Sequence, residues 1–242
     1  MIELAAVRFG YGDGVAVLDG VDLQIGPGLT LLVGPNGCGK STLLKLLAGV
    51  EPPDAGRVSV AGHDLWRDEV AARRPLSYVP EHPDLTPYAS LLEVLRLVAR
   101  LRGEPLERAA RALAEAGLAE RAGASVRELS AGQRRRALLA AAWIGTPRVA
   151  LLDEPLESLD RVLRDRVLGW IEELVRGGAT VVVVSHQIEP FATLATATVT
   201  VRDGRTLGPI AVEGDVAQRL ALLERLARGE PASSTARGGG AT

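Results

Sequence analysis

GPNGCGKS, the sequence of residues 34–41, has the spacing G-x-x-x-x-G-K-[ST] of a phosphate-binding loop, or P-loop. Its glycines let the backbone fold its N–H groups around phosphate oxygens, and the N-terminus of a following helix adds positive potential. The apolar run 29–33 predicts a buried strand before the loop, and the leucine spacing in 41–48 predicts that helix. We therefore expect a nucleotide to bind here. The residues expected to contact it are Gly34, Pro35, Asn36, Gly37, Cys38, Gly39, Lys40, Ser41 and Thr42.

Three side chains of this loop carry distinct chemistry. Lys40 can reach the β- and γ-phosphates of a nucleotide, and the Ser41 hydroxyl can be a ligand of Mg²⁺. We expect the thiol of Cys38, beside a helix N-terminus, to have a lowered pKa and to be reactive. The alternative for Cys38 is a small residue that simply fits the loop.

Strand and helix patterns alternate along the rest of the chain and predict an α/β fold. They indicate a P-loop NTPase core with a mainly parallel sheet, an N-terminal antiparallel β-subdomain and a helical subdomain inserted at about 86–145. We expect one domain over 1–228 and a disordered tail over 229–242. The predicted strands are 15–18, 21–25, 29–33, 57–60, 76–79, 149–152, 181–184 and 198–201, with a hairpin turn at Asp203-Gly204. The predicted helices are 41–48, 91–101, 106–116, 161–175 and 216–228.

Composition narrows the classes of function. The 242 residues include 28 Lys and Arg against 30 Asp and Glu, and 47% are hydrophobic, which is typical of a globular protein with a sizeable core. The slight negative charge without a basic stripe disfavours a nucleic-acid partner. One Cys excludes an internal disulfide framework. No apolar run approaches the ~20 residues of a membrane span, so we expect no transmembrane segment and no secretory signal.

A second stretch, RVALLDE at 148–154, is an apolar strand pattern that ends in two carboxylates. This is the Walker B form, in which Asp153 would hold Mg²⁺ and Glu154 would act as general base toward the attacking water. Two acids after a strand also suit an ordinary loop start. The pair gains weight because the same chain carries a P-loop.

A third stretch, LSAGQ at 129–133, lies about twenty residues before that pair. Ser130 and Gln133 have the spacing of a capping box, which predicts that a helix begins here, and the dipole of such a helix suits a phosphate. The arginine run 134–136 is interpreted as a solvated first turn. With these motifs in this order, the chain from Met1 to about Ala211 resembles the ATP-binding-cassette (ABC) ATPase family, whose signature usually reads LSGGQ.

The resemblance implies a site shared between two subunits. The signature residues would touch the γ-phosphate of ATP held by the other subunit, and Asp160 of LESLD (156–160) would lie at the dimer interface. The implied contacts from the signature are Ser130, Ala131, Gly132 and Gln133.

The resemblance also assigns roles to two aromatic residues. His186, after the strand pattern 181–184, would contact the γ-phosphate and orient water, and Tyr11 would stack on adenine. Taken alone, each is as well explained as a structural residue at a strand end. With the resemblance, the predicted catalytic residues are Glu154, His186 and Lys40.

Glu81 departs from the family pattern, which usually has Gln after this strand. Several bacterial drug- and antibiotic-export cassettes carry a similar Pro-Glu form. A carboxylate can still bind Mg²⁺, so the predicted metal ligands are Ser41, Glu81 and Asp153. We also expect Glu81 to couple the ATP site to a partner on the helical subdomain, because 82–90 leads there and offers the apolar Leu85 and Tyr88.

The function implied by the resemblance is that of the ATP-hydrolysing subunit of a bacterial ABC transporter. It would use ATP and Mg²⁺, pair with a second ABC subunit (a homodimer is favoured) and bind an integral membrane subunit at the cytoplasmic face of the cell membrane. Export is favoured over import on the Glu81 form.

Other readings of the same resemblance stay open. A soluble ABC ATPase of repair, translation or Fe–S assembly is disfavoured, because the chain has no heptad run and only one cassette. A non-catalytic regulatory cassette is disfavoured because all catalytic motifs are in place. A cytochrome-maturation or haem-export cassette is a further variant, since such proteins can also read LSAGQ.

Overall fold

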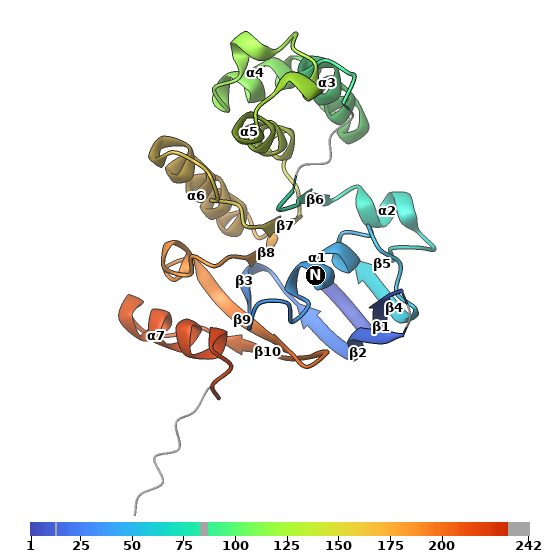
Figure 1. The fold of residues 1–242 in the computed structure, drawn as a ribbon, viewed down its shortest axis with the longest axis vertical. Coiled ribbons are helices and arrows are strands. Elements are labelled where there is room, and N and C mark those ends of the chain that lie inside the picture. Colours follow the sequence, from blue (N-terminus) through green and yellow to red (C-terminus); the bar gives the residue numbers. More distant parts are fainter. Residues whose placement is uncertain (13, 83–86, 232–242) are drawn as a thin grey trace, which may run out of the picture.

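The computed structural model describes residues 1–12, 14–82 and 87–231. Two sheets and an inserted group of helices make up the fold (Figure 1). The strands are β1 (Ile2–Tyr11), β2 (Val15–Ile25), β3 (Gly28–Val33), β4 (Ala55–Val60), β5 (His63–Asp64), β6 (Leu76–Val79), β7 (Val149–Asp153), β8 (Thr180–Val184), β9 (Ala195–Arg202) and β10 (Arg205–Ala211). The helices are α1 (Lys40–Leu47), α2 (Glu69–Arg73), α3 (Leu91–Arg102), α4 (Glu107–Glu115), α5 (Ala131–Ala142), α6 (Arg161–Arg176) and α7 (Val216–Ala227).

The core sheet has the strand order β10-β9-β3-β8-β7-β6 and is parallel from β9 to β6. Its strands β3, β7 and β8 are buried along their whole length, because α1 covers one face and α5, α6 and α7 cover the other. The last strand, β10, pairs with β9 antiparallel through the predicted Asp203-Gly204 turn. The predicted α/β fold with a mainly parallel sheet is confirmed.

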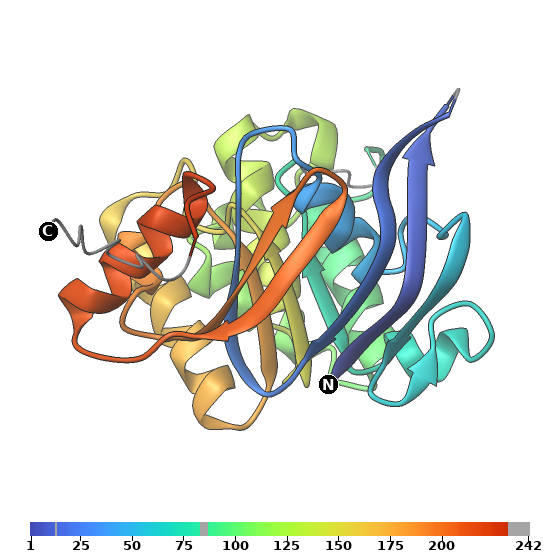
Figure 2. The same ribbon diagram turned by 90° about the horizontal axis from the view of Figure 1, so that it is seen from below.

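The second sheet, β2-β1-β4-β5, is antiparallel and lies on the side of the molecule opposite α7 (Figures 1 and 2). The sequence predicts two strands at 15–18 and 21–25, and this is wrong: β2 is one strand. Gly20 adopts a φ of 69° at a place where the pairing with β1 shifts register, so the chain kinks without turning back. Glycine here marks an irregularity inside a strand, not a turn between two.

The helices α3, α4 and α5 form a group of their own between β6 and β7, with a separate apolar core around Leu91, Leu95 and Leu113. Arg102 fastens this group to the core sheet. Its guanidinium donates to the carbonyl oxygen of Ala141 at 2.9 Å and to Ser77 Oγ on β6 at 3.1 Å. The inserted helical subdomain is thus present. The bounds 86–145 and 1–228 stay predictions, and most of the predicted tail lies outside the described residues.

The carboxyl ends of four parallel strands meet at one edge of the core sheet. Leu32 of β3 and Asp153 of β7 both pair with Val184 of β8, while Val79 of β6 pairs with Leu152. The loops that follow these strands carry the P-loop, the Walker B carboxylates, His186 and Glu81. Among the described residues, no helix reaches the length and apolarity that crossing a membrane requires.

Candidate nucleotide site

A hollow of about 400 Å³ opens at this sheet edge. Its walls come from six separate segments: the tip of β1, the start of β2, the P-loop with α1, and the loops after β6, β7 and β8. The lining residues are Tyr11, Val17, Asn36, Gly37, Gly39, Lys40, Ser41, Thr42, Glu81, Asp153, Glu154, Val184 and His186. Residues that are up to 175 positions apart in sequence (186 − 11) therefore share one small space.

The P-loop backbone needs its glycines. Gly34 has a φ of 144°, and a Cβ there would collide with the carbonyl oxygen of Val201. Gly39, at the N-cap of α1, has a φ of 103°. No side chain caps this helix and its first turn holds no acidic residue, so its free N–H groups and positive dipole end face the hollow. Such a helix start suits a phosphate group.

Lys40 is buried at the base of the loop with 9% of its surface exposed. Its Nζ donates to the carbonyl oxygens of Gly34 at 2.8 Å and Pro35 at 2.9 Å. The ammonium group is therefore held inside the curve of the loop. A phosphate entering the curve would meet a positive charge that is shielded from bulk water.

Asp153, the last residue of β7, is the most deeply buried carboxylate of the hollow, with 2% of its surface exposed. Burial raises the pKa of this carboxyl, and a hydrogen bond from Ser41 partly offsets that rise. Its Oδ1 is buried without a hydrogen-bond partner in the described chain, which is costly unless a cation binds there. Ser41 and Asp153 thus fit a Mg²⁺ site that phosphates and water complete.

The third predicted metal ligand, Glu81, lines the same hollow and is partly exposed, with 42% of its side-chain surface open. Its charge is close enough to contribute to the raised pKa of Asp153. Among the described residues, no three His, Cys, Asp or Glu side chains form a metal cluster by themselves.

Glu154 follows Asp153 with a φ of 48°, the left-handed region that a non-glycine residue rarely adopts. This turn carries its carboxylate toward β8, where Oε1 accepts from the backbone N–H of His186 at 2.8 Å and Oε2 accepts from Ser185 Oγ at 3.2 Å. Burial raises the pKa of this carboxyl, while the nearby His186 lowers it. His186 Nε2 lies 3.7 Å from Glu154 Oε1. An anchored carboxylate with a raised pKa suits a general base.

Tyr11 stands at the mouth of the hollow with 48% of its surface exposed. Phe9 supports its ring edge-on at 4.8 Å between centroids, and its hydroxyl lies 3.5 Å from Thr42 Oγ1. A supported ring with an open side can stack on a planar base. The role predicted for Tyr11 in adenine stacking stays a prediction, and this geometry suits it.

The expectation of a lowered thiol pKa at Cys38 is wrong. Burial raises the pKa of this thiol, and the attraction of Lys40 only partly compensates. The side chain packs against the apolar core cluster beneath α1. The positive helix end faces the hollow, whereas the sulfur is turned toward apolar neighbours. Desolvation therefore affects the pKa of the thiol more than the helix dipole does.

The signature residues lie elsewhere on the chain. Ser130 caps α5 as predicted: its Oγ accepts from the N–H of Gln133 at 3.2 Å, and the Gln133 side chain accepts from the N–H of Ser130 at 2.9 Å. Ser130 and Ala131 are exposed, and none of residues 130–133 lines the hollow.

Asp160 caps α6 and accepts from Arg136 Nη2 at 2.7 Å, also outside the hollow. The chain therefore brings together the residues from Tyr11, the P-loop, Glu81, Asp153, Glu154 and His186, and leaves the signature and Asp160 apart from them.

The family model described as ABC transporter matches residues 18–157. The chain belongs to the ABC transporter family. A Nod factor export ATP-binding protein I of Cupriavidus pinatubonensis is 36% identical over 212 residues, covering 86% of this chain and 65% of that protein. A Streptomyces coelicolor Fe(3+) ions import ATP-binding protein FbpC is 41% identical over 211 residues, covering 84% and 59%. This ABC chain thus spans less than two thirds of the length of these curated relatives.

Solved ABC structures share the fold. The dimeric structure of the cassette MJ0796 in a post-hydrolysis state bound to ADP and Pi superposes with a TM-score of 0.77 at 26% identity. The match covers 89% of this chain and all of that one. The relatives include both export and import proteins, so the comparisons do not choose a transport direction.

Sequence reasoning did not predict the role of Arg135, which lies at the edge of this ABC site. The expectation of a solvated arginine run is wrong for this position, because Arg135 is 5% exposed and donates to carbonyl oxygens at the edge of the hollow. The helical spacing of the sequence could have indicated that Arg135 is buried. Arg135 falls one turn before Leu138 and Leu139 and two turns before Ala142, all of which are buried. The arginine therefore starts the inward face of α5.

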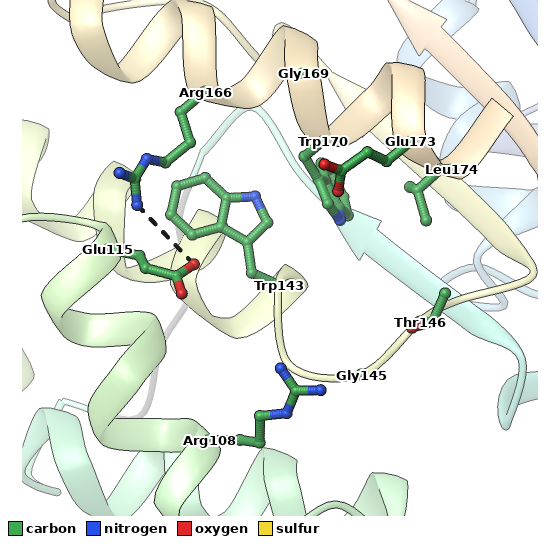
Figure 3. A pocket seen from close by; sticks show the side chains of 10 residues that line it. All are labelled: Arg108, Glu115, Trp143, Gly145, Thr146, Arg166, Gly169, Trp170, Glu173 and Leu174. Atoms are coloured by element: carbon green, nitrogen blue, oxygen red, sulfur yellow. Dashed lines mark ion pairs between the residues drawn. The ribbon is translucent and has the colours of Figure 1, made fainter. Parts of the chain in front are cut away.

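A second cavity, of about 560 Å³, lies between α4, the end of α5 and α6 (Figure 3). Trp143 and Trp170 form part of its wall, and Arg166 pairs with Glu115 across it at 4.0 Å. None of the predicted site residues lines this cavity. Its ion pair joins the helical group to α6. Because the predicted site residues line the P-loop hollow and not this cavity, we assign the chemistry of this ABC chain to the P-loop hollow.

Proposed function

We propose that this chain is an ATP-hydrolysing subunit that powers transport through a separate membrane subunit. The observation that carries the proposal is the shared hollow, in which the P-loop cation, an orphaned carboxylate and an anchored second carboxylate face one another. A bound Mg²⁺ would neutralise the negative charge that develops on the phosphates. The chain's own residues would do the rest by positioning and electrostatics.

Most of the predicted site residues in the hollow have a proposed part in the reaction. Tyr11 stacks on adenine, the P-loop N–H groups and Lys40 hold the phosphates, and Ser41 with Asp153 holds the metal. Glu154 accepts a proton from the attacking water, and its bond from the His186 backbone keeps it oriented. His186, whose Nε2 lies near that carboxylate, orients the same water toward the γ-phosphate.

We infer that the complete site needs two copies of the chain. Ser130 lies exposed at the N-terminus of α5, outside its own chain's hollow, where its helix end is free to meet a phosphate bound elsewhere. A second copy facing the first would bring each signature to the other's P-loop. The dimeric cassettes among the similar structures support this arrangement.

The partner proposed for this dimer is an integral membrane subunit that docks at the cytoplasmic face of the membrane. Glu81 would report the state of the ATP site to it. Tyr88, with 79% of its surface exposed, offers an apolar group near that docking side, and the predicted contribution of Leu85 lies outside the described residues. Export is preferred on the Pro80-Glu81 form alone, since the relatives include both export and import proteins.

The test has two arms. Purified chain should release phosphate from Mg-ATP, and chain isolated from its native membrane should co-purify with an integral membrane protein identified by mass spectrometry. Hydrolysis without any membrane partner would indicate a non-transport ABC ATPase. Failure to bind or hydrolyse ATP would overturn the proposal altogether.

A further inference from the structure

Arg135 joins the ends of two strands that carry site residues. Its Nη1 donates to the carbonyl oxygens of Pro80 and Glu81, just after β6, the second at 3.2 Å. Its Nη2 donates to the carbonyl oxygens of Asp153 and Glu154, at the end of β7, the first at 2.8 Å. One buried guanidinium therefore holds four backbone carbonyls that belong to two different loops of the hollow.

This arrangement depends on the shape of arginine. The guanidinium is planar and presents its two terminal nitrogens as a fork, so each nitrogen can serve one strand end. A lysine ammonium is a single point and would reach both ends only poorly. Burial lowers the pKa of Arg135, while the charges of nearby carboxylates, those of Glu157, Asp153, Glu154 and Glu81, raise it. These charges and the four charge-assisted bonds to carbonyl oxygens together offset the loss of solvation.

The position of Arg135 on α5 links these hydrogen bonds to the signature at the start of the same helix. It lies five residues after Ser130, so the helix that begins with the signature also grips the chain's own Glu81 and Glu154 backbones. Arg135 thus connects the exposed N-terminal end of α5 to the backbones that carry these two carboxylates. A shift of α5 would move the carbonyl of Glu154, whose unusual φ already sets the direction of its carboxylate.

We infer that Arg135 is a positioning residue: it sets the spacing between the Glu81 and Glu154 loops and ties that spacing to the orientation of the signature helix. The inference rests on the proposed ATPase function of the hollow. Arg135 lines no part of the hollow itself, so it acts through the two backbones that it holds. Its loss should slow the chemical step and leave the P-loop contacts to ATP in place.

Arg102 offers a matched control. It is a partly buried arginine of the helical group whose guanidinium also donates to backbone carbonyls and to β6, but its partners are Ala141, Ala142, Ile144 and Ser77. None of these four residues lines the hollow. If arginines that bind backbone carbonyls had a purely structural role, substitution at both positions would have the same effect.

The experiment compares Arg135→Gln, Arg135→Lys and Arg102→Gln with wild type in the full chain, by steady-state phosphate release, binding of a fluorescent ATP analogue and thermal unfolding. For Arg135→Gln we expect kcat to fall by roughly tenfold to a hundredfold, as displaced catalytic groups do. Binding of the analogue should change less than about threefold, because P-loop contacts persist. Arg135→Lys should recover part of kcat, and Arg102→Gln should lower the unfolding temperature while keeping kcat.

Three outcomes would overturn the inference. They are a wild-type kcat in Arg135→Gln, no difference in kcat between Arg135→Lys and Arg135→Gln, and a kcat loss in Arg102→Gln as large as that in Arg135→Gln. If the glutamine variant does not fold, a wild-type kcat in Arg135→Lys would overturn it. A wild-type chain that does not hydrolyse ATP would instead contradict the proposed function, which keeps the two failures distinct.

Discussion

Glu154 Oε1 accepts a 2.8 Å hydrogen bond from the backbone N–H of His186, across the neighbouring ends of β7 and β8. This bond links the loops that follow two buried parallel strands through a side chain, not through the sheet ladder. Together with the φ of 48° at Glu154, it sets the carboxylate at one place in the hollow.

Replacing Glu154 with glutamine should leave ATP binding intact and reduce phosphate release by at least about a hundredfold. The amide oxygen can still accept from His186, but the amide cannot take a proton from water. The measurement is steady-state phosphate release beside binding of a fluorescent ATP analogue. Glu157→Gln, the same change at an exposed residue three positions on, is the control. If Glu154→Gln keeps most of the wild-type rate, another group is the base.

Asp153→Asn should make the nucleotide-free and metal-free chain more stable at neutral pH. Burial raises the folded-state pKa of Asp153, so the folded chain favours the protonated form and loses stability as pH rises from the ordinary value of about 3.9 through the raised one. The gain in unfolding temperature should therefore appear at pH 7.5 and shrink at pH 4. Asp165→Asn, at an exposed position, should show no such trend. An Asp153→Asn variant less stable than wild type at pH 7.5 would contradict the burial argument.

Cys38 should react with maleimide more slowly than a free cysteine at neutral pH, because its pKa is raised and the thiolate is the nucleophile. Mg-ATP should slow the reaction further, since Cys38 belongs to the phosphate loop. The chain has one cysteine, so total labelling reports this site alone, and Cys38→Ser supplies the background. Equal labelling rates with and without nucleotide would separate Cys38 from the bound phosphates.

Glu81→Gln should keep much of the ATPase activity, because an amide oxygen still offers a ligand to the metal and to water. Glu81→Ala should lose the stimulation of hydrolysis by the membrane subunit more than it loses basal hydrolysis. Rates of the isolated chain and of the reconstituted complex decide this, with Glu120→Ala on the helical group as the control. Full stimulation and transport in Glu81→Ala would make Glu81 an ordinary loop acid.

The parts of this fold that sequence predicts well are those with strong local signals. β6 spans the predicted 76–79, and α6 and α7 end within a residue of prediction, because their apolar spacing is regular. The sequence predicts two strands in place of β2, because a glycine such as Gly20 is compatible with both a turn and a strand irregularity. Only the pairing with β1 distinguishes the two. The short β5 and α2 carry too little pattern to be recognised.

The residues of the site divide in the same way, into those that local sequence signals predict and those that they do not. The spacing of the P-loop and Walker B residues in the sequence predicts their roles, and the parallel sheet brings them together. The Cys38 pKa was mispredicted because its sign depends on which way the sulfur points, which sequence does not encode locally. Arg135 was missed because its partners are backbone carbonyls 18 to 55 positions away in sequence. Contacts to backbone atoms leave no residue-type signature at the partner positions.

Mixed dimers test most directly whether a second copy of the chain completes the ATP site. Ser130→Arg subunits and Lys40→Ala subunits should each be inactive alone, the first still binding ATP. Mixed in equal amounts, they should recover roughly a quarter of the wild-type phosphate release, because about half of the dimers are then heterodimers with one intact site each. Stable mixed dimers that release no more phosphate than either variant alone would contradict the shared site.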